Sequence, residues 1–262
     1  MKTAPSKPTE LERKPSPPAH RLDRCKTALL DLIFPPRCGG CGIAVGPGSG
    51  GRLCEQCSTE VSYLGSPICT CCGAPLSADG GSEDRFCLFC LASRPAYDRA
   101  RSLLHYRPPL SRLLHRFKFQ GDTAAGACLS GLVTYGQFNQ MSVAQGCELI
   151  IPVPLHRSRL RARGMNQSLV LARLIFRSSA DKIRPSVLIR IKNTRSQTDL
   201  SGDERRQNLR GVFAVNPKEA VAGRRILLVD DVFTTGTTVD ECAKTLKKQR
   251  AAEILVWTLA RA

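Results

Sequence analysis

The stretch Ile226-Leu227-Leu228-Val229-Asp230-Asp231-Val232-Phe233-Thr234-Thr235-Gly236-Thr237-Thr238 decides the fold of this chain. Four aliphatic residues end in two carboxylates, a threonine-rich loop around one glycine follows, and an amphipathic segment then runs to Gln249. This order predicts a buried parallel strand, a loop and a helix. Backbone N–H groups at a helix N-terminus attract anions, so the segment predicts a phosphate-binding loop beside two acidic side chains. Such a pocket would suit a phosphorylated sugar.

A simpler interpretation of this stretch is an ordinary α/β turn with a capping threonine. One carboxylate or one threonine would be explained equally well that way. The pair Asp230 and Asp231, followed by four threonines around Gly236, favours the ligand-binding interpretation. No Lys-Ser or Lys-Thr follows the glycine, which excludes a Walker loop.

From Arg99 onward, predicted strands and helices alternate. Strands are expected at 100–106, 148–153, 187–192, 225–229 and 253–259, and helices at 110–119, 124–135, 166–178, 201–209 and up to Gln249. This alternation predicts an α/β fold with a doubly wound, mostly parallel sheet. Ligands of such sheets bind beyond the carboxyl ends of the strands, where Pro154 and Asp230 would both lie.

The segment 37–91 is rich in cysteine, glycine and proline and poor in core residues. Thirteen cysteines in a chain without a recognisable export signal argue for metal binding rather than disulfides. C-x-x-C spacing places two thiolates on one turn, so eight thiolates predict two closed, structural Zn²⁺ sites. The predicted ligands are Cys38, Cys41, Cys54, Cys57, Cys69, Cys72, Cys87 and Cys90.

The sequence does not determine which four of these cysteines bind each zinc ion. Neighbouring pairs close the shorter loops, which favours one ion on 38/41/54/57 and one on 69/72/87/90, but a cross-braced arrangement is an alternative. Cys71 competes with Cys72 as a ligand. The spacing from Cys69 and the glycine at position 73 favour Cys72.

The chain has 262 residues, a net charge of +17 and a pI near 9.7, which favour contact with polyanions such as nucleic acid. Basic residues cluster at 99–118, 157–163 and 190–210 with few acidic residues between them. Aromatic residues make up only 5%, so backbone-directed binding is expected rather than base stacking. No apolar run approaches the roughly 20 residues of a spanning helix, and we expect a cytoplasmic protein without membrane insertion.

The expected organisation has three parts. Residues 1–24 form a basic, proline-rich tail that is expected to be disordered. Residues 25–92 form the cysteine-rich module, which begins with a short helix at 25–34 that ends at two prolines. Residues 99–262 form the α/β domain.

The stretch around Asp230 and Gly236 resembles the phosphoribosyl pyrophosphate signature of type I phosphoribosyltransferases. Taken with segments 29–41, 151–167 and 205–213, the whole chain from about Cys25 is similar to the ComF competence family. That family joins a double zinc-ribbon module to a phosphoribosyltransferase-like domain and is associated with uptake of transforming DNA in bacteria. The resemblance implies phosphoribosyl pyrophosphate with Mg²⁺ as ligand, single-stranded DNA as a further partner, and an assembly partner such as a DNA translocase.

The resemblance also implies roles for individual residues. Asp230 and Asp231 would bind the ribose hydroxyls and stabilise the cation that develops at C1, while Mg²⁺ bridges hydroxyls and pyrophosphate. Arg157 would neutralise the leaving pyrophosphate. Segment 192–200 matches a mobile loop that in relatives covers phosphoribosyl pyrophosphate, the donor of the phosphoribosyl group. An ordinary surface loop fits this segment equally well. The 5-phosphate cradle would comprise Thr234, Thr235, Gly236, Thr237 and Thr238.

The acceptor side of such a reaction has no signature in this sequence. Purine-salvage relatives carry a carboxylate at the first loop position, where this chain has Thr234. One hypothesis is therefore an enzyme that transfers phosphoribose to an unknown acceptor. The other is a non-catalytic competence factor that binds single-stranded DNA or senses phosphoribosyl pyrophosphate.

Overall fold

The computed structural model describes residues 35–46, 53–77, 81–119, 123–136, 146–194 and 208–262. The predicted tail at 1–24, the helix at 25–34 and most of the helix at 201–209 lie outside these residues. Within the described ranges, no helix combines the length and the apolar character needed to cross a lipid bilayer.

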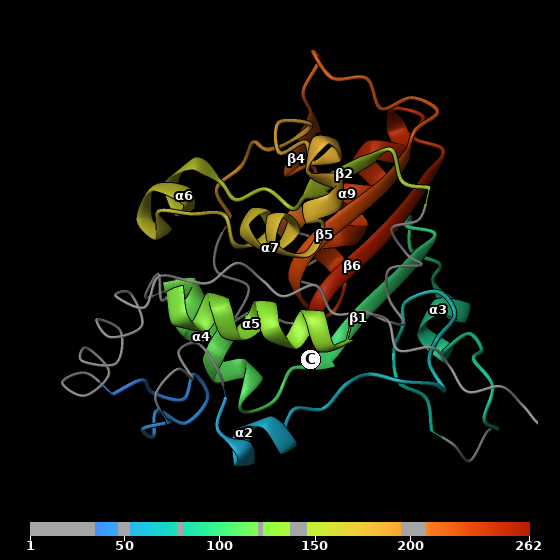
Figure 1. The fold of residues 1–262 in the computed structure, drawn as a ribbon. Helices are drawn as coiled ribbons and strands as arrows, with labels where there is room; N and C mark the ends of the chain where they lie inside the picture. Colours follow the sequence, from blue (N-terminus) through green and yellow to red (C-terminus); the bar gives the residue numbers. More distant parts are fainter. Residues whose placement is uncertain (1–34, 47–52, 78–80, 120–122, 137–145, 195–207) are drawn as a thin grey trace, which may run out of the picture.

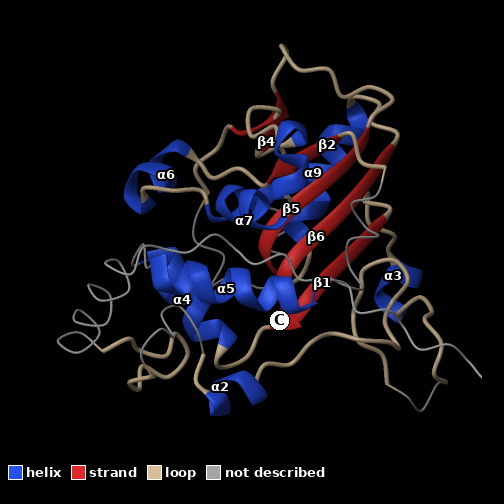
Figure 2. Ribbon diagram, viewed as in Figure 1, coloured by secondary structure: helices blue, strands red, loops and turns tan. Residues whose placement is uncertain are grey.

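The centre of the fold is a parallel four-stranded sheet with the order β1-β6-β5-β2 (Figure 2). Its members are β1 (Arg99–His105), β6 (Glu253–Arg261), β5 (Arg225–Phe233) and β2 (Leu149–Pro152), and every pairing between them is parallel. A separate antiparallel pair is formed by β3 (Leu188–Arg190) and β4 (Phe213–Val215). The predicted mostly parallel α/β sheet is thus confirmed.

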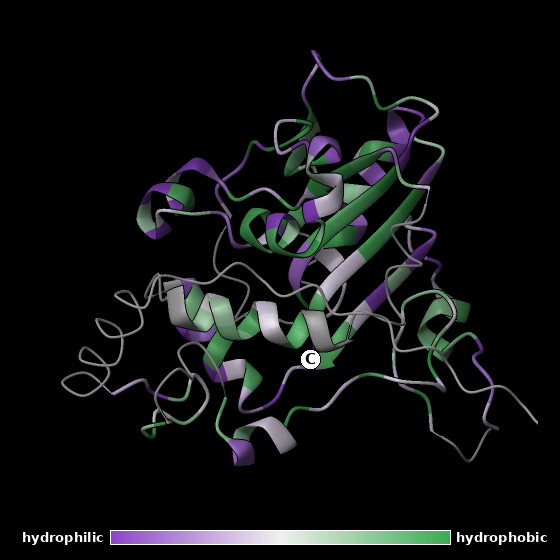
Figure 3. Ribbon diagram, in the orientation of Figure 1, coloured by the Kyte–Doolittle hydropathy of each residue, from purple (hydrophilic) through white to green (hydrophobic). Residues whose placement is uncertain are grey.

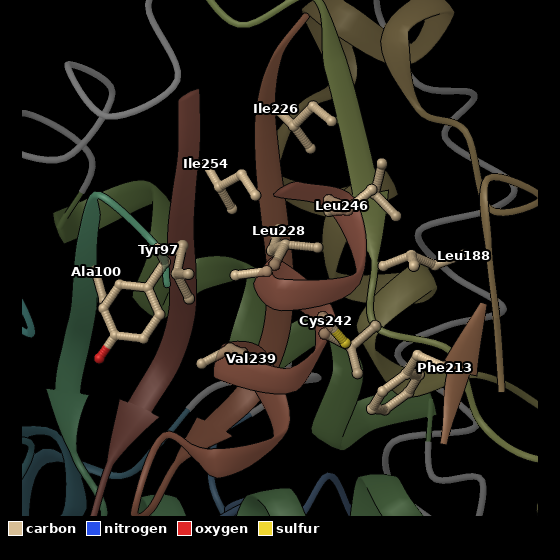
Figure 4. Close-up of a cluster of buried hydrophobic side chains, with 14 of the residues drawn as sticks. Tyr97, Ala100, Leu188, Phe213, Ile226, Leu228, Val239, Cys242, Leu246 and Ile254 are labelled. Carbon is tan, nitrogen blue, oxygen red and sulfur yellow. The ribbon is translucent and has the colours of Figure 1, made fainter. Parts of the chain in front are cut away.

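Helices cover both faces of this sheet, as the alternation of strands and helices predicts (Figure 1). Leu227 and Val229 of β5 pack in one core with helices α4 (Leu110–Phe119), α5 (Thr123–Gly136) and α7 (Gln167–Ile175). Ile226 and Leu228 point to the opposite core, which contains α9 (Thr237–Lys248) and the β3–β4 pair (Figure 4). Both faces of β5 and β6 are buried, which explains their continuous apolar sequences (Figure 3).

Three elements differ from the sequence-based expectation, and the first two of them affect the site. β5 continues past Val229 to Phe233, because β6 runs beside it and pairs Phe233 with Arg261. Helix α6 (Arg157–Arg163) follows Pro154 in a segment where no helix was expected. This helix buries none of its residues and is mostly hydrophilic (Figure 3). The helix predicted at 166–178 ends at Ile175 and is followed by the 3₁₀ helix η4 (Arg177–Lys182).

The cysteine-rich segment packs directly against the α/β domain. It contains α2 (Glu55–Thr59) and α3 (Leu88–Ala92), which lie below the sheet and beside β1 in Figure 1. The Leu64 N–H donates to Leu103 O at 2.9 Å, and the His105 N–H donates to Ser62 O at 2.9 Å, so residues 62–64 cover the outer edge of β1. The Ala100 N–H donates to Cys71 O at 2.7 Å, which ties a second part of the segment to the same strand.

Candidate functional site

A cavity of about 460 Å³ opens at the carboxyl ends of β2 and β5. Strand order places these ends side by side, because Pro152 pairs with Val229. The volume of this cavity lies within the range of binding sites for small ligands. The cavity is lined by Tyr106, His115, Lys118, Val153, Pro154, Leu155, Arg159, Arg163, Gln167, Ser168, Arg190, Asp230, Asp231, Val232, Thr234 and Thr238.

The two predicted carboxylates line this cavity, and each has a partner from another element. Ser168 Oγ donates to Asp230 Oδ1 at 2.8 Å, and the Asp231 N–H donates to the same oxygen at 2.9 Å. Lys118 Nζ forms an ion pair with Asp231 Oδ2 at 2.6 Å. Burial, followed by the charge of Asp231, raises the pKa of Asp230 to about 7 despite the hydrogen bonds that lower it. A carboxylate that titrates near neutrality is typical of a functional site.

Three arginines bring positive charge to the same cavity: Arg159 and Arg163 of α6, and Arg190 at the end of β3. Arg190 is only 7% exposed, and its guanidinium lies 5.5 Å from the Phe213 ring centroid. Its Nη2 donates to Thr194 Oγ1 at 2.6 Å, whereas its Nε has no hydrogen-bond partner among the described residues. A buried guanidinium with an unpaired donor favours an anionic ligand at this position.

The threonine-rich loop connects β5 to α9 and brings its first and last threonines, Thr234 and Thr238, to the cavity. Gly236 is the N-cap of α9 and has a φ of 75°, a conformation that favours glycine. Thr235 Oγ1 and Thr237 Oγ1 lie 2.7 Å apart and hydrogen-bond to each other. The loop therefore has the conformation of a helix N-terminus beside the two carboxylates, as the sequence predicts.

The N-terminus of α7 supplies polar residues that sequence reasoning did not assign to the site. Asn166 caps the helix through Oδ1 and donates from Nδ2 to Val153 O at 3.1 Å, which joins α7 to the chain after β2. Gln167, 2% exposed, accepts from Arg163 Nη1 at 3.4 Å and donates to Lys118 O at 3.3 Å. The sequence feature that could have identified these residues was the polar run Asn166-Gln167-Ser168 at the start of a predicted helix.

The remaining predicted site residues lie apart from the cavity lining. Arg157 is exposed at the start of α6 and is not among the residues that line the cavity, whereas Arg159 and Arg163 are. Thr194, in the segment predicted to cover the donor, accepts from Arg159 Nη2 through its carbonyl at 2.8 Å. Residues 195–200 of that segment lie outside the described ranges.

The eight predicted cysteine ligands form two clusters of four. In each cluster the sulfur atoms all lie within 4.8 Å of one another, and the groups are the neighbouring pairs rather than a cross-braced arrangement. Cys41 and Cys54 sulfurs are 3.7 Å apart, and Cys72 and Cys87 sulfurs are 3.8 Å apart. Tetrahedral Zn–S bonds of about 2.3 Å require sulfurs separated by about 3.8 Å, so the clusters fit zinc. Cys72, not Cys71, belongs to the second cluster.

Backbone amides favour the thiolate form of one cysteine in each cluster. Cys38 Sγ accepts from the N–H groups of Gly40 at 3.3 Å and Cys54 at 3.2 Å. Burial acts to raise the pKa of Cys38, but backbone hydrogen bonds outweigh it and lower the pKa to about 6. The same balance brings the pKa of Cys69 to about 6, with amides of Cys87 and Cys72 as donors. Thiolates stabilised in this way suit metal coordination.

Two family models match the chain, one in each of its halves. The Double zinc ribbon domain matches residues 29–91, and the Phosphoribosyl transferase domain matches residues 158–262. Together with the sheet and the cysteine clusters, these matches define a zinc-ribbon protein with a phosphoribosyltransferase-like fold.

Relatives that match most of the chain narrow this class to one family. Competence protein F of Haemophilus influenzae is 36% identical over 216 residues, which cover 80% of this chain and 90% of that protein. DNA utilization protein YhgH of Escherichia coli is 32% identical over 233 residues, covering 88% and 99%. Competence protein ComFC of Bacillus subtilis is 27% identical over 218 residues, covering 80% and 84%. The chain belongs to the ComF competence family.

Proposed function

We propose that the cavity binds phosphoribosyl pyrophosphate together with Mg²⁺. The observation that carries this proposal is the convergence of Asp230, Asp231 and the loop threonines Thr234 and Thr238 with cationic side chains in one cavity. The loop would hold the 5-phosphate through its N–H and hydroxyl groups. The carboxylates would accept hydrogen bonds from the ribose 2- and 3-hydroxyls. Mg²⁺ would be shared between these hydroxyls and the pyrophosphate.

The pyrophosphate end of the donor would lie against the arginines. Arg159 and Arg163 line the cavity, so we assign them the role that the sequence suggested for Arg157. Arg190 adds a buried charge whose Nε is unpaired in the described part of the chain. If transfer occurs, these charges would stabilise the leaving pyrophosphate, and Asp230 and Asp231 would stabilise the cation that develops at C1.

Calorimetry on the zinc-loaded full chain tests donor binding. Phosphoribosyl pyrophosphate with Mg²⁺ should bind wild type, and Asp230→Asn and Asp231→Asn should each weaken the binding about tenfold or more. Lys248→Gln, on the exposed C-terminal end of α9, serves as the control. No heat of binding in wild type would contradict the proposal. Release of pyrophosphate with candidate acceptors then separates a transferase from a protein that only binds the donor.

We also propose that the protein binds single-stranded DNA and acts in DNA uptake. Support comes from the net charge of +17 and from exposed arginines at 107 and 112 near α4 and at 157 and 161 on α6. The names of the relatives, competence protein and DNA utilization protein, point the same way. A cytoplasmic location and a DNA translocase as assembly partner complete this proposal.

A salt titration tests the DNA proposal separately from the donor site. Arg157→Glu with Arg161→Glu should lower the affinity for single-stranded DNA and flatten its dependence on salt. Donor binding should be unchanged, because neither residue lines the cavity. Equal DNA affinity and equal salt slope in wild type and variant would contradict a DNA-binding face on α6.

A further inference from the structure

The second cysteine cluster is contacted by a residue from the far end of the α/β domain. Arg261, the last residue of β6, donates from Nη1 to Cys72 O at 2.8 Å, and its Nη2 lies 3.7 Å from Cys72 Sγ. These residues are 189 positions apart in the sequence, so only the fold brings them together. Four thiolates around one Zn²⁺ leave a net negative charge, which strengthens a hydrogen bond from a guanidinium to sulfur.

The same guanidinium lies over an aromatic ring beneath the threonine loop. Its carbon is 4.3 Å from the centroid of the Phe233 ring, a distance typical of a cation–π contact. Phe233 is 3% exposed and immediately precedes Thr234. Tyr97 packs against the Phe233 ring in an edge-to-face arrangement, with ring centroids 6.3 Å apart.

The Phe233 ring in turn lies against Gly236. A Cβ built on Gly236 would be 2.9 Å from Phe233 Cε1 and closer still to Cζ. The ring therefore leaves the loop backbone no room to move inward. A continuous set of contacts thus joins Cys72, Arg261, Phe233 and Gly236.

We propose that Arg261 is a positioning residue that couples zinc in the second cluster to the conformation of the threonine loop. Zinc fixes the thiolates, the thiolates hold Arg261, and Arg261 fixes the ring that supports Gly236. Where the loop binds the donor, as proposed above, donor binding and zinc binding at the second cluster strengthen each other by the same factor. The claim that Arg261 fixes the conformation of the threonine loop does not require a bound donor. The claim that donor binding and zinc binding are coupled rests on the proposed function.

NMR of the full chain with cadmium in place of zinc tests both parts. The two clusters give separate cadmium signals, and labelled threonine methyls report on the loop. Arg261→Gln should shift the cadmium signal of the second cluster and the loop methyl signals without any ligand. Arg101→Gln is a matched control, because Arg101 Nη1 donates to Cys69 O at 3.3 Å and Thr70 O at 3.2 Å, next to Cys72 in the second cluster. That variant should leave the loop methyl signals in place.

Donor addition gives the second measurement. Phosphoribosyl pyrophosphate with Mg²⁺ should slow zinc release from the second cluster in wild type, and Arg261→Gln should abolish this effect and weaken donor binding about tenfold. Phe233→Leu interrupts the same contacts at another residue, so it should shift the loop signals and also abolish the effect of the donor on zinc release. It replaces Arg261→Gln as the test if that variant does not fold.

The outcomes separate the two proposals. Loop methyl signals that stay at their wild-type positions in Arg261→Gln, or in Phe233→Leu, overturn the positioning role whether or not the donor binds. A donor that fails to bind wild type overturns the proposed function, while the ligand-free signals still decide the role of Arg261. A donor that binds with no effect on zinc release overturns the coupling.

Discussion

Replacement of Gly236 by alanine tests whether the threonine loop depends on close packing against Phe233. Gly236 has a φ of 75°, and an alanine in that conformation costs about 1–2 kcal/mol. Its Cβ would also overlap the Phe233 ring, with Cε1 at 2.9 Å, and overpacking of this kind costs a further 1–3 kcal/mol approximately. The expected loss of folding free energy is therefore about 2–5 kcal/mol.

Gly223 provides the matched control. It has a φ of 70°, but a Cβ there would meet nothing within 4 Å. Gly223→Ala should therefore lose only the backbone contribution of about 1–2 kcal/mol. The difference between the two variants in denaturant unfolding of the zinc-loaded chain isolates the overlap with the ring.

Donor binding then connects packing to function. Gly236→Ala should weaken phosphoribosyl pyrophosphate binding by more than about tenfold, because the loop must move away from Phe233 to admit the Cβ. Gly223→Ala should bind normally. Adding Phe233→Leu to Gly236→Ala should restore part of the lost stability by removing the ring atoms that clash. If both alanine variants lose the same stability and bind equally well, the ring does not set the position of the loop.

Further predictions concern the carboxylates, the buried arginine and the metal. The pKa of Asp230 is raised to about 7, so donor binding that needs its ionised form should be full above that pH and weaken as pH falls from about 8 to about 6. Ser168→Ala removes a hydrogen bond that lowers this pKa and should move the midpoint of the affinity–pH curve upward; an unmoved midpoint would assign the titration to another group. Arg190→Gln should weaken pyrophosphate binding by about 1.5–3 kcal/mol, and unchanged affinity in calorimetry would remove it from the anion site. Chelation of zinc should speed hydrogen exchange at the Leu64 amide, which bonds to β1, more than at the Val153 amide, which donates to Val229 O of β5; equal exchange would show that the edge contact does not need the metal.

The sequence predicted the central elements well because their patterns are local. Continuous aliphatic runs identified β5 and β6, and the carboxylates and threonines that follow Val229 identified the loop. The end of β5 was placed too early, since acidic residues are unusual in strands and only the neighbouring β6 extends the pairing to Phe233. Helix α6 was missed because its arginine-rich sequence has no apolar face to bury.

The partners of the carboxylates could not be predicted in the same way. Ser168 is 62 positions from Asp230 in the sequence, and the separation between Lys118 and Asp231 is larger still. No periodicity or spacing rule relates residues at such distances. Lys118 was assigned to a basic cluster by its neighbours in sequence, whereas the fold turns it into the ion-pair partner of Asp231.

The cysteine clusters illustrate the opposite case, in which spacing is sufficient for the ligands but not for their role in the domain. C-x-x-C spacing and short loop closure gave the correct grouping of all eight thiols. Nothing in that spacing indicated that residues 62–64 would cover β1, which is otherwise an edge strand of the sheet. An uncovered edge strand invites pairing with other chains, so the segment between the two clusters completes the sheet. Zinc should therefore stabilise the α/β domain as well as the ribbons, because the first cluster ends at Cys57 and the second begins at Cys69, on either side of the covering segment.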